Sequence, residues 1–282
     1  MGKLRIMSNN VWNCDTNKPA WEAKGEDCSA AVRMKGFVRV YRETSPDIIG
    51  GQEFSMKNYD ELLRGLEADG QKYAALWGRS TPIIYRQDKL ELIDSDYIPY
   101  PNTIDGIEGE FNPTKSKSCC AAVFRDKSDG KVFVFASTHL WWMEGNPESP
   151  DYRAGSDEAR VFQLNLAMDR IEALAEKYGC PIVLVGDMNA KYNSPAIHSA
   201  FARGYVHAHD TAVEYADDSM GYHFCFPEGY HNHYYDNPFE DAIDHILVKG
   251  AGDGFVRRFE RYSPEYYFPL SDHSPVFIDA EL

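Results

Sequence analysis

The sequence predicts a single large domain of the α/β or β-rich class, in which short buried strands outnumber helices. Short runs of apolar and β-branched residues, mostly bracketed by turn-forming residues, are typical of strands buried on one or both faces. These runs are Leu4–Met7, Ile48–Ile49, Pro82–Tyr85, Val132–Ala136, Ile182–Val185, Ile243–Val248 and Pro275–Ile278. The chain shows no internal repeat or linker, so we expect residues 1–282 to form one domain.

Helices are fewer, and the clearest is predicted at Ser156–Lys177. Its apolar residues recur at three- and four-residue steps and so share one face. They are Val161, Leu164, Met168, Ile171, Leu174 and Tyr178. Acidic residues occupy the first turn, and Gly179 is placed to end the helix. Two further helices are expected at Ala30–Arg42 and Tyr59–Glu67.

The connections contain one turn signal and two long loops. Asp129-Gly130 separates the apolar segments Ala121–Arg125 and Lys131–Ala136, which indicates a β-hairpin. Long loops are expected at Pro99–Lys117 and Glu214–Asp241. Because long loops in a compact domain often carry function, both are candidates for a binding rim.

The composition favours a globular protein with a sizeable core, since 43% of the residues are hydrophobic. No apolar run approaches the roughly 20 residues that a membrane-spanning helix needs. The first residues lack the pattern of a signal peptide. We therefore expect a monomeric cytoplasmic protein, secreted only if a signal peptide preceded this sequence.

The net charge of −15 argues against duplex DNA as a partner, because nucleic-acid affinity depends largely on Lys and Arg. The segment Glu214–Asp241 contains no Lys or Arg but is rich in aromatic residues. Those considered for stacking are Tyr222, Phe226, Tyr230, Tyr234 and Tyr235. The opposing possibility is a basic strip formed elsewhere, for instance by Lys115, Lys117, Arg153 and Arg160.

The cysteines and paired histidines give little support for a zinc site. None of the six cysteines belongs to a pair of CxxC motifs, so buried free thiols are expected. His207 and His209, like His231 and His233, have a spacing that zinc sites use, but no Cys or third His is obviously near. We interpret them as loop histidines.

Polar residues that suit a hard cation or a phosphate stand at the ends of six expected strands. A single strand-end Asp is usually a turn or cap residue, but six such positions together indicate one site. The positions are Asn9-Asn10, Glu53, His139, Asp187-Met188-Asn189, Asp244-His245 and Ser271-Asp272-His273.

These positions resemble the endonuclease/exonuclease/phosphatase superfamily in order and spacing over essentially the whole chain. Gly186-Asp187-Met188-Asn189 and Ser271-Asp272-His273 are specific in combination. Thr138-His139-Leu140 and Arg160-x-x-Gln163 resemble the deoxyribonuclease I, sphingomyelinase and deadenylase-like branch. The resemblance implies an α/β (α+β) fold, a four-layer sandwich of two packed mixed, mostly antiparallel β-sheets flanked by helices.

The resemblance also implies a magnesium cofactor, with Mn²⁺ as a substitute. Magnesium prefers oxygen ligands and needs only one or two protein carboxylates besides water and substrate. Glu53 is the first choice for the main ligand, with Asp272 and Asn10 close to it. Asp187 is expected to hold or deprotonate the attacking water, and Asn189 to orient it.

Two histidines complete the expected catalytic set. His139 is placed to donate to a non-bridging phosphate oxygen or to protonate the leaving alkoxide. The resemblance pairs Asp244 with His273, which would fix the imidazole tautomer and raise its basicity.

Trp141-Trp142 departs from the polar residues that usually follow this histidine in deadenylase-like members. The pair could stack on a sugar or base, or it could pack in the core. We name Trp141, Trp142, Arg160 and Tyr234 as candidate substrate-binding residues.

The sequence thus predicts a Mg²⁺-dependent phosphoesterase, a phosphodiesterase or phosphatase acting on a small or single-stranded phosphate ester. A nuclease or deadenylase-type exonuclease is the alternative. A catalytically silent binding module is less favoured, because every metal and nucleophile position is present. The leaving group is left open, since many substrates share this catalytic core.

Overall fold

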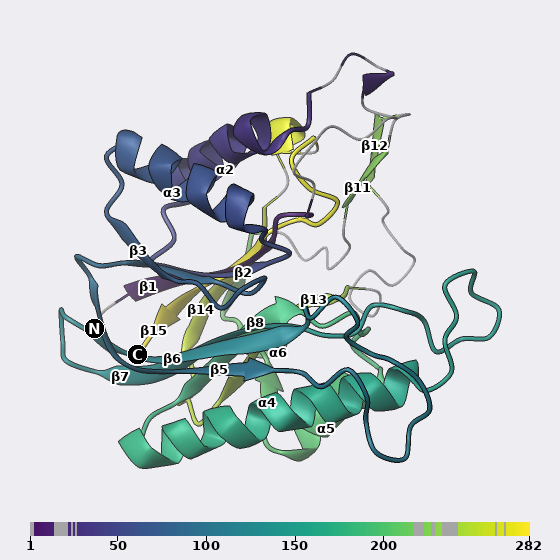
Figure 1. Ribbon diagram of the computed structural model, residues 1–282. Helices are drawn as coiled ribbons and strands as arrows, with labels where there is room; N and C mark the ends of the chain where they lie inside the picture. Colours follow the sequence, from purple (N-terminus) through teal and green to yellow (C-terminus); the bar gives the residue numbers. More distant parts are fainter. Residues whose placement is uncertain are drawn as a thin grey trace.

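In the computed structural model two β-sheets lie face to face, and helices cover the outer face of each (Figure 1). Helices α2 and α3 lie on one sheet, and α4 and α5 lie on the other. The predicted four-layer sandwich of two mixed, mostly antiparallel sheets is confirmed. The structure describes residues 3–13, 22–23, 25, 27–216, 223–226, 229–232, 242–262, 264–267 and 269–282.

The described strands form two large sheets and one pair. The seven-stranded sheet has the order β10 (Glu214–Tyr215), β14 (Val256–Arg261), β15 (Val276–Glu281), β1 (Lys3–Asn10), β2 (Ile48–Gln52), β4 (Ile83–Arg86) and β3 (Tyr73–Leu76). The six-stranded sheet has the order β5 (Leu90–Pro99), β6 (Ser118–Asp126), β7 (Val132–His139), β8 (Ile182–Asp187), β13 (Asp244–Lys249) and β9 (Val206–His207). The pair consists of β11 (His223–Phe226) and β12 (Gly229–Asn232).

The helices in the described ranges are mostly short, apart from α4. They are α2 (Ala30–Thr44), α3 (Met56–Ala68), α4 (Ser156–Tyr178), α5 (Pro195–Ala202), α6 (Ala208–Thr211) and the 3-10 helix η1 (Glu265–Tyr267). The three predicted helices are confirmed as α2, α3 and α4. Helix α3 begins three residues earlier than expected, because the Ser55 hydroxyl accepts the Asn58 backbone N–H at 3.1 Å and caps the helix there.

The apolar strands are buried on both faces, because successive side chains point to opposite sides of a sheet. In β1, Ile6 packs between the sheets and Met7 packs against α2 and α3. In β7, Phe135 packs between the sheets and Val134 packs against α4. The continuous apolar runs in the sequence therefore correspond to strands inside a four-layer sandwich.

Several strands were missed because their patterns are polar or because they are very short. Strand β5 lies at the edge of its sheet and alternates acidic with apolar residues, and β14 carries three arginines. Strand β3 is a four-residue edge strand. The prediction of a loop over Glu214–Asp241 is wrong in part, because the described residues of this segment include β10, β11 and β12. The hairpin prediction is confirmed, because β6 and β7 are antiparallel with Ala121 opposite Ala136.

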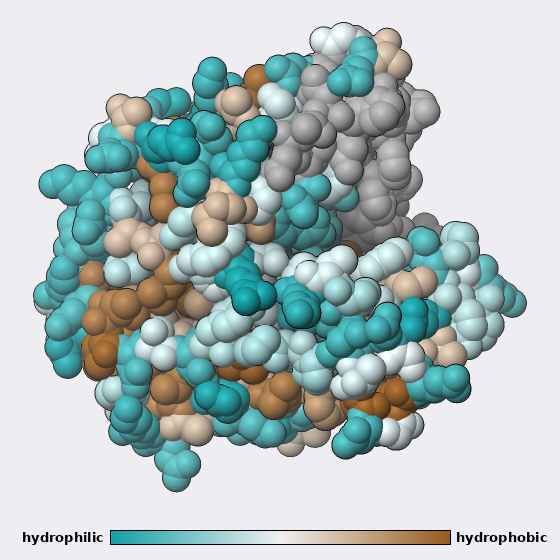
Figure 2. Space-filling model, viewed as in Figure 1, coloured by the Kyte–Doolittle hydropathy of each residue, from teal (hydrophilic) through white to brown (hydrophobic). Residues whose placement is uncertain are grey.

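The burial of the described cysteines and the polarity of the visible surface agree with what the sequence predicts. Of the cysteines with described side chains, Cys119 and Cys120 are buried free thiols, Cys28 is buried, and Cys180 is half-buried. Within the described ranges, no helix combines the length and apolar character that a membrane crossing requires. Hydrophilic residues cover most of the face in Figure 2, and its hydrophobic residues gather mainly on the side where the termini lie in Figure 1.

The two sheets come into close contact at Gly50 of β2. A Cβ at this position would overlap Cγ2 of Val185 in β8 and lie 2.9 Å from Cβ of Ser137 in β7. Buried hydrogen bonds run beside this contact. The Gln52 side-chain amide donates to the Ser137 hydroxyl at 3.1 Å, and that hydroxyl donates to the Gly51 carbonyl at 2.9 Å. Together these contacts fix the end of β2 against the ends of β7 and β8.

We expect Gly50→Ala to lower the free energy of unfolding by about 1–3 kcal/mol, because the added methyl group forces the sheets apart. Gly252→Ala is the matched control, since a Cβ there meets no atom within 4 Å. Urea unfolding of both variants measures the difference. Equal stability of the two variants would show that the sheets are not in tight contact at Gly50.

Candidate active site

The polar strand-end residues meet at one end of the two sheets. Some strands end there, and antiparallel strands begin there. Asn10, His139 and Asp187 are the last residues of β1, β7 and β8. Glu53 follows β2, which is parallel to β1. Asp244 is the first residue of antiparallel β13 and lies opposite Asp187, while His139 is the parallel neighbour of Asp187.

The backbone is unusual at two of these positions. Glu53 and Asn189 have left-handed φ angles of 60° and 46°. This conformation costs an L-residue roughly 1–2 kcal/mol, although asparagine tolerates it better than glutamate. Gly186, three residues before Asn189, lies in β8 where a Cβ would overlap the Thr138 carbonyl of β7. Strained residues of this kind concentrate where side chains must point into a functional site.

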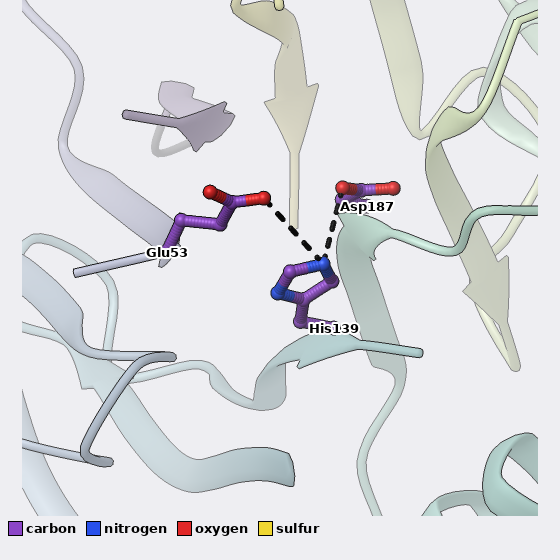
Figure 3. A group of neighbouring side chains, drawn as sticks. All are labelled: Glu53, His139 and Asp187. Carbon is purple, nitrogen blue, oxygen red and sulfur yellow. Dashed lines mark ion pairs between the residues drawn. The ribbon is translucent and has the colours of Figure 1, made fainter. Parts of the chain in front are cut away.

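Two carboxylates from different sheets meet at one imidazole (Figure 3). Nε2 of His139 lies 3.3 Å from Oδ2 of Asp187 and 3.9 Å from Oε1 of Glu53. The Asn10 amide nitrogen donates to the same two carboxylates, at 2.9 Å to Asp187 and 3.3 Å to Glu53. Its amide oxygen accepts the Trp12 backbone N–H at 2.8 Å. In this arrangement Asn10, a candidate metal ligand, links the two carboxylates through its N–H groups.

The contact that the resemblance implies between Asp244 and His273 is present. Nδ1 of His273 lies 2.7 Å from Oδ2 of Asp244. Its Nε2 lies 3.8 Å from Asp187 and 3.9 Å from Asp272. Burial disfavours the imidazolium, but these three carboxylates outweigh burial and raise the pKa of His273 well above its usual value.

The three carboxylates that face this region differ in their ionisation. Burial opposes the charged form of Asp187, but the two histidines and Lys117 outweigh it and lower its pKa. The pKa of Glu53 is lowered for a similar reason. Burial raises the pKa of Asp272 to about 6, and its Oδ1 is buried without a hydrogen-bond partner.

The donor atoms fit a divalent cation that prefers oxygen. Ligand atoms of Glu53, His139 and Asp187 lie within 4.8 Å of one another, and so do those of Asp187, Asp244 and His273. Asp272, which we expected to be a ligand, belongs to neither group of described residues. Asp272 nevertheless lines a cavity together with Glu53, His139 and Asp187, and its buried Oδ1 accepts no hydrogen bond from the described residues. Clustered carboxylates with an unsatisfied oxygen suit a hard cation that keeps some of its waters.

Asn189 connects the ends of β7 and β8. Its backbone N–H donates to Oδ1 of Asp187 at 3.0 Å, and its side-chain amide donates to the Leu140 carbonyl at 3.1 Å. The Leu140 N–H donates to the Asp187 carbonyl at 3.1 Å. These bonds hold the Asp187 carboxylate with its second oxygen toward His139.

Lys117 is the site residue that the sequence interpretation missed, because it was considered only for a basic strip. It lines a cavity of about 590 Å³ together with Glu53, His139 and Asp187, and its ammonium contacts Nε2 of His139. Burial lowers its pKa to about 8, against the effect of Glu53 and Asp187. A signal was available, since Lys117 precedes the buried strand β6, whose first residue pairs with His139.

The family model for the Endonuclease/Exonuclease/phosphatase family matches residues 10–273, which include every catalytic and metal-binding candidate. The chain belongs to this family. Its members are phosphoesterases or nucleases, which hydrolyse phosphoester bonds. Curated protein sequences give no match to the chain.

Solved structures share the fold at low sequence identity. A family protein from Bacteroides thetaiotaomicron has a TM-score of 0.74 at 19% identity, covering 99% of this chain and 97% of that one. A mannosyl-6-phosphatase from Bacteroides thetaiotaomicron VPI-5482 has a TM-score of 0.71 at 21% identity, with 99% and 100% covered. Truncated Caenorhabditis elegans TDP2 has a TM-score of 0.63 at 17% identity, with 99% and 97% covered. At these identities the likeness establishes the fold.

The two tryptophans have different environments. Trp141 is buried against Phe111 and Ala159, and its indole N–H donates to the Ser156 hydroxyl at 3.1 Å. Trp142 is 47% exposed. Both residues line the cavity, but only Trp142 presents a large exposed ring.

The other two candidates for substrate binding have different outcomes. Arg160 is buried and does not line the cavity, and its guanidinium donates to the carbonyls of Trp141 and Met143 at 3.2 and 2.6 Å. It therefore holds the tryptophan segment, where we expected it to contact substrate. Tyr234 lies outside the described residues.

The loop interpretation is wrong for His207, which is buried in β9. His245 Nε2 lies 2.7 Å from the Ala190 carbonyl, and its Nδ1 lies 3.0 Å from Nε2 of His207. Nδ1 of His207 accepts the His209 backbone N–H at 3.2 Å. This chain of bonds requires neutral imidazoles, and burial lowers the pKa of His245 to about 4 and that of His207 well below its usual value. The side chain of His231 and all of His233 lie outside the described residues.

We expect the free energy of unfolding to fall by up to about 3 kcal/mol per pH unit as the pH drops below about 6.5, because each of the two histidines contributes up to about 1.4 kcal/mol per unit. Below that pH the unfolded chain protonates His207 and His245, while the folded chain keeps them neutral down to lower pH. Thermal unfolding of His207→Gln between pH 7 and pH 5 should show a shallower dependence than the wild type. His198→Gln, at an exposed histidine, is the control. Parallel curves for all three proteins would contradict this account of the buried pair.

Proposed function

We propose that this protein is a divalent-cation-dependent phosphoesterase that uses water to hydrolyse a small phosphate ester. The observation that carries the proposal is the convergence of carboxylates and imidazoles from both sheets in one cavity. These residues are Glu53, His139, Asp187, Asp272 and His273. The mannosyl-6-phosphatase with the same fold supports a phosphatase reaction in such a framework.

Asp187 is the residue best placed to hold the attacking water. Its pKa is lowered, so it is ionised at neutral pH and accepts a hydrogen bond from the water. Asn189 fixes one carboxylate oxygen by its backbone N–H and lies beside the same cavity. The water oxygen forms a bond to phosphorus while the bond from phosphorus to the leaving oxygen breaks, and the leaving oxygen takes a proton from the site.

Nitrogen-bearing side chains lie around the position proposed for the phosphate. Lys117 and His139 lie together on one side, and His273 is kept protonated by Asp244 and its neighbours. Donors that are fixed before the reaction stabilise the charge that develops on the phosphoryl oxygens. A divalent cation held by Glu53, with Asp272 beside it, would add Lewis-acid stabilisation of that charge. His139 is the proposed proton donor to the leaving oxygen.

Turnover should require Mg²⁺ or Mn²⁺, and a screen of phosphate mono- and diesters with each cation tests the proposal. Chelation should abolish hydrolysis, and Glu53→Gln should raise the Mg²⁺ concentration for half-maximal activity by at least about tenfold, because it removes a ligand charge. Glu67→Gln, at an exposed position of α3, is the matched control. Unchanged turnover after exhaustive chelation would refute the metal dependence.

Small phosphate esters should be hydrolysed in preference to duplex DNA. Among the described residues that line the cavity, Lys117 is the only Lys or Arg, and the chain carries a net charge of −15. A duplex nuclease contacts many backbone phosphates through Lys and Arg. A plasmid-nicking assay at low salt measures the alternative nuclease activity. Efficient cleavage of supercoiled DNA that Asp187→Asn abolishes would establish the nuclease reading instead.

A further inference from the structure

The cavity has a rigidly held wall at Leu140–Met143, which carries the exposed ring of Trp142. The Trp141 backbone N–H donates to the Gln163 side chain at 2.8 Å. The Arg160 guanidinium binds the carbonyls of Trp141 and Met143, one on each side of Trp142. Asn189 holds the Leu140 carbonyl. The backbone on both sides of Trp142 is thus fixed by side chains from α4 and from the catalytic loop after β8.

The indole of Trp142 is supported by a second ring. Its centroid lies 6.2 Å from that of Trp141, with an interplanar angle of 47°. Trp141 in turn packs edge-on against Phe111, with centroids 5.7 Å apart and an interplanar angle of 86°. Trp142 therefore presents its exposed surface to the cavity from a fixed position, and little conformational entropy is lost when a ligand stacks on it.

Neutral polar groups line the same cavity. Ser80, Thr114 and Ser116 supply hydroxyl groups, and the hydroxyls of Thr114 and Ser116 lie 2.8 Å apart. Hydroxyl groups both donate and accept hydrogen bonds, so they match the hydroxyls of a polyol. An aromatic face with neutral hydrogen-bonding groups is a suitable site for a sugar ring, which has apolar C–H faces and a polar edge.

The charge of the cavity limits the substrate to one phosphate. Lys117 lies deep beside His139, while the exposed Asp151 adds a negative group to the lining. Among the described lining residues no second Lys or Arg is available for another phosphate. Polyphosphates and phosphodiester chains would therefore place an uncompensated negative charge near Asp151.

We propose that Trp142 is a specificity-determining residue that stacks on the leaving group, and that the leaving group is a neutral sugar ring. The substrate class is a sugar phosphate monoester, with the phosphate at Lys117 and His139 and the ring against Trp142. This inference rests on the proposed phosphoesterase function and adds the chemistry of the leaving group.

Steady-state kinetics with three kinds of substrate test the inference: the 6-phosphates of glucose, mannose and galactose, glycerol 3-phosphate, and adenosine 5′-monophosphate. Glycerol 3-phosphate is the key comparison, because it carries its phosphate on a primary alcohol but has no ring. The wild type should show a kcat/KM at least about tenfold higher for a hexose 6-phosphate than for glycerol 3-phosphate. Trp142→Ala should lower kcat/KM for the hexose phosphate about tenfold more than for glycerol 3-phosphate, chiefly through KM.

Two variants separate stacking from a general loss of structure. Trp142→Phe keeps an aromatic face and should recover most of the preference for the ring. Phe162→Ala removes an exposed ring of α4 that does not line the cavity, and it should leave all rates unchanged.

The outcomes distinguish the inference from the function on which it rests. If neither these three kinds of substrate nor a wider panel of phosphate esters is hydrolysed with Mg²⁺ or Mn²⁺, both the inference and the proposed function are overturned. The inference alone would be overturned if the wild type showed no preference for the hexose phosphates. It would also be overturned if Trp142→Ala lowered kcat/KM equally for the hexose phosphate and for glycerol 3-phosphate. A preference for adenosine 5′-monophosphate would likewise replace the sugar with a nucleobase as the stacking partner.

Discussion

The candidate site depends on the contact between the two sheets at Gly50, because each sheet supplies only some of its ionisable residues. Glu53 follows β2 of one sheet, while His139 and Asp187 end β7 and β8 of the other. The absence of a side chain at Gly50 allows the sheets to approach, and hydrogen bonds around Ser137 fix their relative position. A small displacement between the sheets would separate the carboxylates that meet at His139, so the geometry of the candidate site depends on sheet packing.

Charge balance explains why so many ionisable groups can be buried together. Isolated buried charges are costly, and paired ones need nearly ideal geometry and extra hydrogen bonds. Here the histidines and Lys117 lower the pKa of Asp187 and Glu53, but Asp272 keeps a raised pKa and an unpartnered oxygen. The protein alone therefore leaves a local deficit of positive charge. A divalent cation at the proposed site would supply the missing positive charge.

The sequence could predict what depends on chain direction and side-chain alternation. Apolar runs located most of the central strands, and the polar residues at their ends located the site, because parallel and antiparallel strands meet at the same edge. It could not predict contacts that depend on long-range packing. The amide orientation of Asn10, the contact of Lys117 with His139, and the binding of Arg160 to loop carbonyls all involve residues far apart in the chain. His207 was misread because spacing does not report burial.

The most direct test of the account is the fate of solvent oxygen during hydrolysis of a phosphate ester that the enzyme accepts. The reaction is run in ¹⁸O-labelled water, and mass spectrometry measures the label in the phosphate and in the alcohol. Attack of water on phosphorus beside Asp187 predicts label in the phosphate, none in the alcohol, and a much slower reaction with Asp187→Asn. Label in the alcohol would place bond cleavage at carbon and would contradict the mechanism.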